Sequence, residues 1–316
     1  MDPSSTARVS TRTQTRQVRV RAHAKINLDL RLGARRADGF HDLTTILQSI
    51  ALHDTVTLRA VAGPFRVRCA AAGVPEGEAN LVWRTAHRLW AALGRRGDPR
   101  GVTISIAKRI PIAAGLGGGT ADAIAVLRGL CRLWDVSPGP TCLHEVAAEV
   151  GTDGPFFLVG GTALGVGRGD EVYPLVELPR HWVVIAVPPR RVSTAVAYSW
   201  MDHDEAATAR RVRRSIGRMR RFPPVAGSTL DLTALANDLE RPVARRRPEI
   251  RVATRMLADA GALPAAMTGS GSAVFGLFMR RASAIEAAGG VRRDGWTVLV
   301  TRTLDRAGLA RQFWVS

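Results

Sequence analysis

Lysine is almost absent from this chain: Lys25 and Lys108 are the only two among 45 basic residues, so arginine carries the formal net charge of +18. Such one-sided use of arginine is typical of a GC-rich genome as much as of a nucleic-acid partner. The densest run, Arg210 to Arg221, has almost no aromatic residues between its arginines, and stacking on bases would need them. We therefore interpret the run as a solvated helix face or loop, with attraction of an anionic substrate or of adventitious nucleic acid as the alternative, and we favour a protein without a nucleic-acid partner.

Cysteine and long apolar stretches are also scarce, which narrows the class of protein. The three cysteines show no C-x-x-C spacing, and a sparse, odd set of this kind is typical of reduced thiols in the cytoplasm. No run of about 18 apolar residues is free of charges, so no membrane span and no membrane partner are expected. Residues 1–16 contain no apolar core of a secretory signal. We predict a cytoplasmic globular protein with a disordered tail over residues 1–16.

Several common motifs of catalysis and nucleotide binding are missing. The chain has no H-E-x-x-H, no Cys/His set with zinc spacing and no G-x-S-x-G elbow. It has instead the stretch P-I-A-A-G-L-G-G-G-T-A-D-A, which starts at Pro111 and leads into apolar residues with helical spacing up to Trp134. No lysine follows the last glycine, as the phosphate loop G-x-x-x-x-G-K-[ST] requires, and G-x-G-x-x-G does not match either.

A loop that feeds the N-terminus of a helix is a natural anion site. Bare N–H groups and the helix dipole favour phosphate there. We predict Thr120 as the N-cap and Asp122 in the first helical turn. Four glycines would remove the side chains that keep a ligand off the backbone: Gly115, Gly117, Gly118 and Gly119. The alternative is a glycine-rich turn that only lets a strand and a helix pack closely.

Two charged residues lie in settings that call for a function. Alternation of apolar and polar residues predicts one long strand or two strands over Val18 to Leu32, with Lys25, Asn27 and His23 in phase on one face. Lys25 stands between two apolar neighbours, so its charge needs a partner. Asp153 lies in a G-T-D-G-P turn that can aim a carboxylate, although an ordinary Asp turn explains it equally well.

The remaining segments alternate between strand and helix patterns, so we assign the chain to the α+β class. Expected strands cover Leu43 to Leu58, Phe65 to Ala70, Val102 to Ala107, His181 to Val187, two strands joined by a turn within Ala265 to Phe278, and Trp296 to Thr301. Expected helices cover Asn80 to Leu93 with Asn80 as cap, Leu143 to Val150, Val192 to Tyr198, Ile250 to Ala260 and Ala282 to Ala288. The length allows two domains, which we bound at residues 17–176 and 177–316.

Three segments in this order resemble the three motifs of the GHMP kinase superfamily: A-K-I-N-L, P-x-x-x-G-L-G-G-G-T-A-D-A and M-T-G-S-G-S-A-V-F. Within the superfamily the chain is most similar to the kinases of 4-diphosphocytidyl-2-C-methyl-D-erythritol, through A-K-I-N-L-D-L, R-R-A-D-G-F-H-D-L, I-A-K-R-I-P, G-T-D-G-P-F-F and G-T-A-L-G-V-G-R-G-D. The resemblance covers Val18 to Thr303. It implies a two-domain α+β fold with a ferredoxin-like C-terminal domain and the active site in the inter-domain cleft. The implied activity is ATP-dependent phosphorylation of the 2-hydroxyl of this cytidine diphosphate sugar alcohol, a step of the non-mevalonate isoprenoid pathway.

The resemblance also assigns roles to residues. Lys25 and Asp153 would be the catalytic pair: Asp153 would accept the proton of the 2-hydroxyl, and Lys25 would keep Asp153 ionised and orient the hydroxyl. ATP, accompanied by Mg²⁺ but without a cage of protein side chains for the metal, would lie on Pro111, Ala114, Gly115, Leu116, Gly117, Gly118, Gly119, Thr120 and Ala121. The acceptor would contact Asn27 with its erythritol arm, His41 with the cytosine edge, Phe40 and Tyr198 with the cytosine ring, and Gly269, Ser270 and Gly271 at the cleft.

Some positions depart from the usual pattern of these kinases, and two other functions stay open. The departures are His23 for Pro, Ala114 for Gly, Thr120-Ala121 for Ser-Ser and Gly154 for Val. One alternative is another GHMP small-molecule kinase, of the homoserine or mevalonate type. The other is a basic nucleic-acid-binding protein on a related fold. The pair Phe40-His41 and Tyr198 favour the cytidyl substrate, because an acceptor without a base needs no aromatic clamp.

Overall fold

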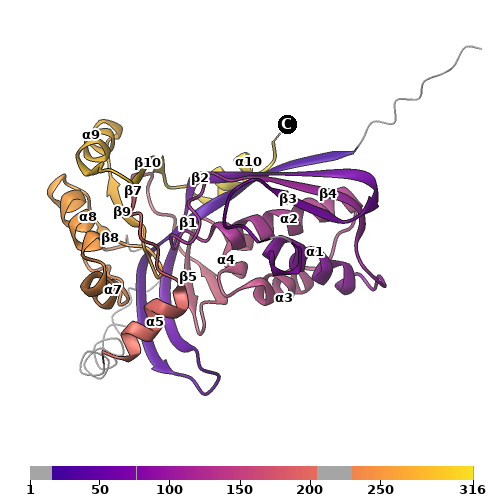
Figure 1. Ribbon diagram of the computed structural model, residues 1–316, viewed down its shortest axis with the longest axis horizontal. Coiled ribbons are helices and arrows are strands. Elements are labelled where there is room, and N and C mark those ends of the chain that lie inside the picture. The colour runs from indigo at the N-terminus through magenta and orange to yellow at the C-terminus, as the bar shows by residue number, and fades with distance from the viewer. Residues whose placement is uncertain (1–15, 76, 205–229, 316) are drawn as a thin grey trace, which may run out of the picture.

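The computed structural model describes residues 16–75, 77–204 and 230–315, so the tail before residue 16 and the run Arg210 to Arg221 lie outside the described residues. Two β-sheets organise the chain (Figure 1), which confirms the α+β class. The six-stranded sheet contains β1 (Gln17–Arg35), β2 (His41–Pro64), β3 (Arg66–Cys69), β4 (Arg100–Ala107), β5 (Thr162–Val166) and β6 (Glu171–Pro174). The four-stranded sheet contains β7 (Trp182–Val187), β8 (Ala265–Met267), β9 (Val274–Phe278) and β10 (Thr297–Arg302).

The strand order is β3-β4-β2-β5-β6 in the larger sheet, with β1 paired to β2, and β10-β7-β9-β8 in the smaller one. Helices of the first half pack beside the larger sheet: η1 (Gly77–Ala79), α1 (Leu81–Ala92), α2 (Gly118–Trp134), α3 (Pro140–Val150) and α4 (Gly154–Val159). The second half adds α5 (Thr194–Asp202), α7 (Glu240–Arg246), α8 (Pro248–Asp259), α9 (Arg281–Val291) and α10 (Arg306–Phe313). All strands and helices predicted above are present, and the Asn80 side chain caps α1 by accepting from the Val82 N–H at 2.9 Å. The segments β5, β6, α4, α7 and α10 were not predicted, because they are short or glycine-rich.

The long antiparallel hairpin of β1 and β2 passes through three hydrophobic cores. Its outer end, including Val20 and Leu58, packs with α1 and α2. Its middle, including Ile26, packs against the smaller sheet. The far part, including Leu30, joins the core under α7 and α8. Because one hairpin contributes to the cores beside both sheets, residues on its middle part lie where the two halves of the molecule meet; the predicted boundary at residues 176 and 177 stays a prediction.

The pairing of β1 with β2 is irregular at the predicted functional residues. The register shifts between His23 and Lys25 and again between Asn27 and Asp29. A β-bulge turns a side chain away from regular alternation, and bulges are frequent beside active sites. Lys25 and Asn27 lie on one face and form a hydrogen bond, whereas His23, across the register shift, packs on the His53 ring at 5.1 Å between ring centroids.

The start of α2 differs from the prediction. The helix begins at Gly118, and Gly117 is the N-cap with φ 69°, a left-handed conformation that glycine adopts without strain. Thr120 is therefore already inside the first turn and is not the cap. Asp122 lies beyond the first turn and is buried, so its carboxylate does not serve the helix dipole.

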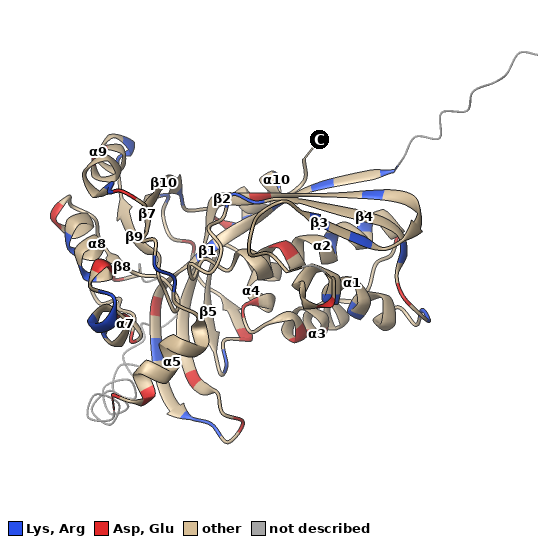
Figure 2. Cartoon of the chain, in the orientation of Figure 1, with Lys and Arg blue, Asp and Glu red and all other residues tan. Residues whose placement is uncertain are grey.

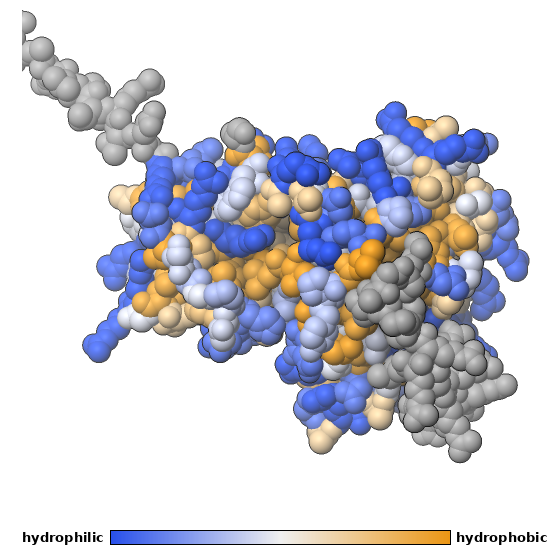
Figure 3. Space-filling model, turned by 180° about the vertical axis from the view of Figure 1, so that it is seen from behind, coloured by the Kyte–Doolittle hydropathy of each residue, from blue (hydrophilic) through white to orange (hydrophobic). Residues whose placement is uncertain are grey.

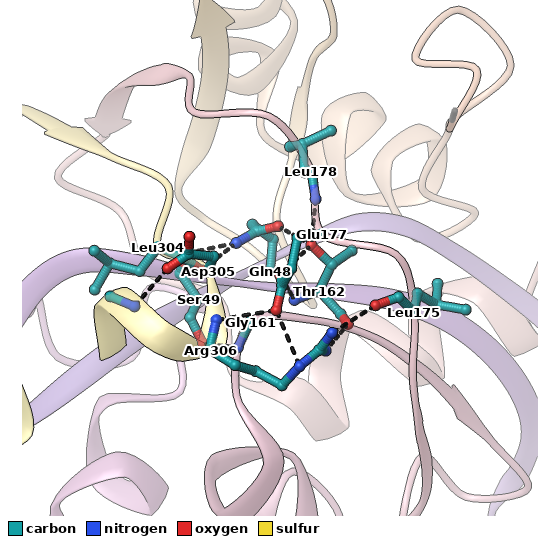
Figure 4. A network of polar contacts seen from close by, with 11 residues as sticks. Gln48, Ser49, Gly161, Thr162, Leu175, Glu177, Leu178, Leu304, Asp305 and Arg306 are labelled. Atoms are coloured by element: carbon teal, nitrogen blue, oxygen red, sulfur yellow. Dashed lines mark hydrogen bonds and ion pairs between the residues drawn. The ribbon is translucent and has the colours of Figure 1, made fainter. Parts of the chain in front are cut away.

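A polar network fastens the C-terminal segment to the larger sheet (Figure 4). Arg306 of α10 donates to the Thr162 carbonyl at 3.0 Å and pairs with Glu177 at 3.0 Å. Gln48 of β2 donates to the Leu304 carbonyl at 2.8 Å and accepts from the Thr162 hydroxyl at 2.7 Å. The end of the chain thus fixes the place where the larger sheet continues into the connection to β7.

Basic residues are distributed over both halves of the described chain (Figure 2). Figure 2 shows Lys and Arg spread over strands and helices of both halves, with acidic residues between them. The reverse face in Figure 3 shows apolar residues in a central band bordered by hydrophilic ones. Of the helices that the structure describes, none combines the length and the apolar character needed to cross a bilayer.

Candidate active site

A cleft of about 610 Å³ opens between the glycine-rich loop, the middle of the β1–β2 hairpin and the turn between β8 and β9. Its two sides are tied together by hydrogen bonds that backbone N–H groups donate. The Ala273 N–H donates to the Ala114 carbonyl at 3.1 Å, and the Asn27 N–H donates to the Thr268 hydroxyl at 2.9 Å. Fifteen of the predicted site residues line the cleft: Lys25, Asn27, Pro111, Ala114, Gly115, Leu116, Gly117, Gly118, Gly119, Thr120, Asp153, Tyr198, Gly269, Ser270 and Gly271.

The glycines of the loop are needed for packing against the protein itself. A Cβ on Gly115 would lie 2.3 Å from the Thr268 carbonyl oxygen, and a Cβ on Gly117 would lie 2.7 Å from the Phe157 ring. A Cβ on Gly118 would lie 2.9 Å from Ile110. The bare sides of Gly115, Gly117 and Gly118 thus face neighbouring elements, which brings the loop close to both halves of the molecule, whereas a Cβ on Gly119 would meet only Leu81, at an ordinary 3.5 Å. That the loop leaves room for a ligand stays a prediction.

The first N–H groups of α2 are nevertheless available to an anion. The N–H of Ala121 donates to the Gly117 carbonyl at 2.8 Å, while an α-helix provides no acceptor for the N–H groups before that position. Within the described ranges, no hydrogen bond engages the N–H groups of Gly118, Gly119 or Thr120. Ala121 itself is buried in the core between α2 and the sheet rather than in the cleft.

Lys25 and Asp153 meet on the floor of the cleft. Nζ of Lys25 lies 3.2 Å from Oδ2 of Asp153 and donates to Oδ1 of Asn27 at 2.6 Å. Asn27 in turn donates from Nδ2 to the Thr45 hydroxyl at 2.8 Å. The Lys25 side chain is 5% exposed and that of Asp153 is 32% exposed, so the carboxylate is open to a ligand while the ammonium is held from behind.

Asp153 occupies the N-cap position of the short helix α4, which packs tightly on α3. A Cβ on Gly154 would lie 1.9 Å from the Ala147 carbonyl oxygen. The glycine, which stands where similar kinases usually have Val, therefore lets α4 start directly against α3. The close approach sets where Asp153 stands relative to Lys25.

Lys108 forms a second buried ionic cluster beside the loop. Its ammonium contacts the carboxylates of Asp54 and, at 2.7 Å, Asp122. Oδ1 of Asp54 also accepts from the Ile110 N–H at 2.8 Å and from the Arg109 N–H. Burial, opposed by Lys108, raises the pKa of Asp122 to about 8, so the cluster retains a proton near neutral pH. Although burial acts against it, the two carboxylates raise the pKa of Lys108.

The residues predicted to surround the cytosine ring, Phe40, His41 and Tyr198, form what we call the aromatic corner, and of their rings, all within the described residues, only two are in contact with each other. His41 and Tyr198 have ring centroids 5.7 Å apart, and Nε2 of His41 lies 3.0 Å from Oδ1 of Asp202. Burial, and then the charge of Asp153, raise the pKa of Tyr198 to about 12, so its phenol stays neutral. Phe40 is 51% exposed, and neither Phe40 nor His41 lines the cleft. Among the described ring contacts, none joins Phe40 directly to Tyr198, and their roles on the two sides of a cytosine ring stay a prediction.

The described residues contain no group of three or more His, Cys, Asp or Glu placed to hold a metal ion. A divalent cation at this site would therefore rely on nucleotide phosphates for most of its ligands, as Mg²⁺ commonly does.

Comparison with known proteins decides the family. Residues 80–161 match the model described as GHMP kinases N terminal domain, and residues 226–295 match GHMP kinases C terminal. The 4-diphosphocytidyl-2-C-methyl-D-erythritol kinase of Pelotomaculum thermopropionicum is 40% identical over 289 residues, which cover 90% of this chain and 97% of that protein. The enzyme of the same name from Gloeobacter violaceus is 44% identical over 272 residues, covering 84% and 87%. The chain belongs to the GHMP kinase family.

Solved structures of other GHMP kinases share the fold. A crystal structure of 4-(cytidine 5'-diphospho)-2C-methyl-D-erythritol kinase superposes with a TM-score of 0.71 at 31% identity, covering 90% of this chain and 98% of that one. Homoserine kinase from Cytophaga hutchinsonii superposes with a TM-score of 0.65 at 19% identity, covering 93% and 96%, which shows likeness of fold alone. The expected two-domain fold and the assignment to ATP-dependent small-molecule kinases are confirmed.

Four residues at or beside the cleft of this GHMP kinase were not predicted: Lys108, Asp54, Asp122 as a partner of Lys108, and Arg168. One signal was available for Lys108, since it is one of two lysines in the chain. No local pattern marks Asp54, because its partners lie far away in the sequence.

Proposed function

We propose that this GHMP kinase transfers the γ-phosphoryl group of ATP to the 2-hydroxyl of 4-diphosphocytidyl-2-C-methyl-D-erythritol. The observation that carries the proposal is the contact of 3.2 Å between Lys25 and Asp153 next to the glycine-rich loop. A partly exposed carboxylate beside a buried ammonium suits a general base that receives a proton from an alcohol. The identity of 40% or more to kinases of that name supports this acceptor.

In the proposed reaction, Asp153 takes the proton of the 2-hydroxyl as the oxygen attacks the γ-phosphorus. The new O–P bond forms, the bond from the γ-phosphorus to the β,γ-bridging oxygen breaks, and ADP leaves. Lys25 holds Asp153 in place and balances its charge. Phosphoryl transfer asks little covalent chemistry of a protein, so positioning and charge neutralisation supply the catalysis.

The phosphates of ATP would lie at the N-terminus of α2. The free N–H groups of Gly118, Gly119 and Thr120 and the helix dipole fit this group. Mg²⁺ would accompany the nucleotide and neutralise the phosphate charge when it is bound. The protein's own part is to hold the loop in place, through the contacts of Gly115 and Gly117 with neighbouring elements.

We place this reaction in the cytoplasm. The three cysteines of the chain are unpaired, as in proteins of a reducing compartment.

The test is release of ADP from ATP with three acceptors in parallel: 4-diphosphocytidyl-2-C-methyl-D-erythritol, homoserine and mevalonate. We expect turnover with the cytidyl acceptor at a kcat/KM at least about 100-fold above the other two, since a site that pairs a buried polar group rejects acceptors lacking it. Preferred turnover of homoserine or mevalonate would replace the proposed acceptor. Binding to nucleic acid that weakens steeply with salt, with no ATP turnover, would replace the kinase assignment itself.

A further inference from the structure

Three cations line the cleft among the residues that the structure describes: Lys25, Lys108 and Arg168. Lys25 is bound to Asn27 and Asp153, and Lys108 to its two buried aspartates. The lysine side chains are 5% and 8% exposed, whereas that of Arg168 is 38% exposed. Arg168 is thus the cation of this set that solvent, and an incoming anion, can reach.

The turn that carries Arg168 is tied to the larger sheet. It follows β5, and both neighbours of Arg168 adopt left-handed conformations, Gly167 with φ 68° and Gly169 with φ 98°. The Gly167 carbonyl accepts from the Leu43 N–H at 2.8 Å, which ties the turn to β2. The location of Arg168 is therefore set by the larger sheet and not by a free loop.

The turn lies between the aromatic corner and the reaction centre. Leu43, to which it is tied, stands two residues after His41 and two residues before Thr45 on β2. Thr45 holds Asn27, the partner of Lys25, while His41 packs on the ring of Tyr198. Two residues of a strand span about 7 Å, so the backbone turn that carries Arg168 meets β2 between the residue beside Tyr198 and the residue that holds Asn27, and Arg168 also lines the cleft.

The guanidinium is oriented from one side. Nε and Nη2 of Arg168 both donate to Oδ2 of Asp170, at 3.1 and 2.6 Å, and Cζ lies 5.5 Å from the centroid of the Phe40 ring. Two of the five N–H groups of an arginine are used in this way. Nη1 has no hydrogen-bond partner within the described ranges. An anion can therefore bind along the free edge of the group.

We propose that Arg168 binds the diphosphate of the cytidyl substrate and so sets the affinity of the enzyme for it. The inference rests on the proposed function. In that substrate the diphosphate joins the cytidine to the methylerythritol. A cleft that holds the hydroxyl at Asp153 and the base beside Tyr198 must hold the diphosphate between them. The planar fork of a guanidinium matches two phosphate oxygens, and its charge balances theirs.

The test compares Arg168→Gln with the wild type. KM for the cytidyl substrate should rise about tenfold or more, since a hydrogen bond to a charged group contributes about 1.5–3 kcal/mol. The loss should fall on KM for this substrate rather than on kcat or on KM for ATP. Arg168→Lys should recover part of the affinity. Calorimetric titration with cytidine diphosphate and with cytidine isolates the contribution of the phosphates to binding. Arg168→Gln should weaken binding of cytidine diphosphate and leave binding of cytidine unchanged.

Arg180→Gln is the matched control, because Arg180 stacks on Trp182 at the same 5.5 Å but does not line the cleft. The inference is wrong if Arg168→Gln leaves the preference for cytidine diphosphate over cytidine unchanged, or if both ligands lose affinity equally, as loss of packing on Phe40 alone would cause. Wild-type turnover of the cytidyl acceptor tests the proposed function separately. If the wild type turns over the cytidyl acceptor but Arg168→Gln leaves the preference for cytidine diphosphate over cytidine unchanged, only the assignment of Arg168 is overturned. If that preference depends on Arg168 but the wild type does not turn over the acceptor, only the kinase reaction is overturned.

Discussion

The two lysines of this chain lie in the same cleft, yet their surroundings differ in one decisive respect. Lys25 faces a carboxylate that is 32% exposed, whereas Lys108 faces carboxylates that are 0% and 5% exposed. An exposed carboxylate can meet a substrate and exchange a proton with it. Asp54, sealed from solvent and bound to the Arg109 and Ile110 N–H groups, and the buried Asp122 cannot meet a substrate in this way. We infer that the first pair serves chemistry and the second serves stability.

Both positions keep lysine although arginine supplies nearly all other positive charge. An ammonium is a compact charge whose three N–H donors can point to different partners, whereas a guanidinium is a wide planar fork. Nζ of Lys25 contacts Asn27 and Asp153, and Nζ of Lys108 contacts two aspartates, in each case within a buried space. The two-partner contacts of each ammonium suit this compact geometry.

The largest expected effect is on catalysis at the exposed pair. Asp153→Asn and Lys25→Ala should each lower kcat about 10²- to 10⁴-fold, the usual contribution of a general base, while the free energy of unfolding changes little. Steady-state ADP release and urea unfolding measure the two quantities. Asp135→Asn is the control, since Asp135 is 89% exposed and lies outside the cleft. Near-normal turnover of either variant would contradict the catalytic assignment.

For the buried contact between Asp54 and Lys108, substitution should lower the free energy of unfolding rather than act directly on kcat. Asp54→Asn removes the charge that balances Lys108 and weakens the hydrogen bonds from the Arg109 and Ile110 N–H groups. Breaking a buried ion pair from one side costs about 3–5 kcal/mol, so the urea midpoint should fall clearly. If Asp54→Asn instead lost turnover at unchanged stability, the distinction between the two lysines would be wrong.

His41 provides a third case, in which the partner carboxylate of Asp202 is 34% exposed, about as much as that of Asp153. His41→Ala should raise KM for the cytidyl substrate about tenfold, the effect of losing roughly 1.4 kcal/mol of binding, and leave KM for ATP unchanged. Initial rates with each substrate varied in turn give both constants. An unchanged KM for the cytidyl substrate would remove His41 from base recognition.

Asp122 sharpens the comparison within the buried cluster. Its folded pKa is raised, so the folded state binds a proton that the unfolded state has lost, and stability falls as pH rises from about 4 to 8. Asn mimics the protonated carboxyl, so Asp122→Asn should change stability at pH 7 far less than Asp54→Asn does. Urea unfolding from pH 5 to 8 should show a shallower decline in the variant than in the wild type. Equal slopes would show that Asp122 is ionised throughout.

His23 is a buried titratable group without a carboxylate partner. Burial, and then the nearby charge of His53, lower its pKa to about 3, with Arg21 and Arg302 acting in the same direction. The unfolded state therefore binds a proton that the folded state refuses, and stability should fall as pH drops below about 6.5, by up to about 1.4 kcal/mol per pH unit. His23→Leu should flatten this decline in urea unfolding between pH 7 and 4. A decline as steep as that of the wild type would assign the acid sensitivity to other groups.

Local patterns in the sequence predicted much of the molecule. The loop before α2, the period-two strand around Lys25 and the cap at Asn80 depend on residues close together in the chain, where backbone preferences and side-chain periodicity act directly. The short elements β5 and α4 escaped prediction, because glycines in and around them read as turns. Only the packed structure reveals that these glycines permit close contact between elements.

The sequence by itself determined which groups are available for the proposed chemistry: a lysine in a buried strand, an acid in a turn and a glycine loop feeding a helix. Tertiary structure decided which of them meet. Bulges around Lys25 and the close packing of Gly154 on α3 bring that lysine to Asp153, while Lys108 goes to Asp54 and Asp122. The same packing places the Phe40 ring beside Arg168. Such pairings depend on long-range approach and on burial, which no local pattern of residues specifies.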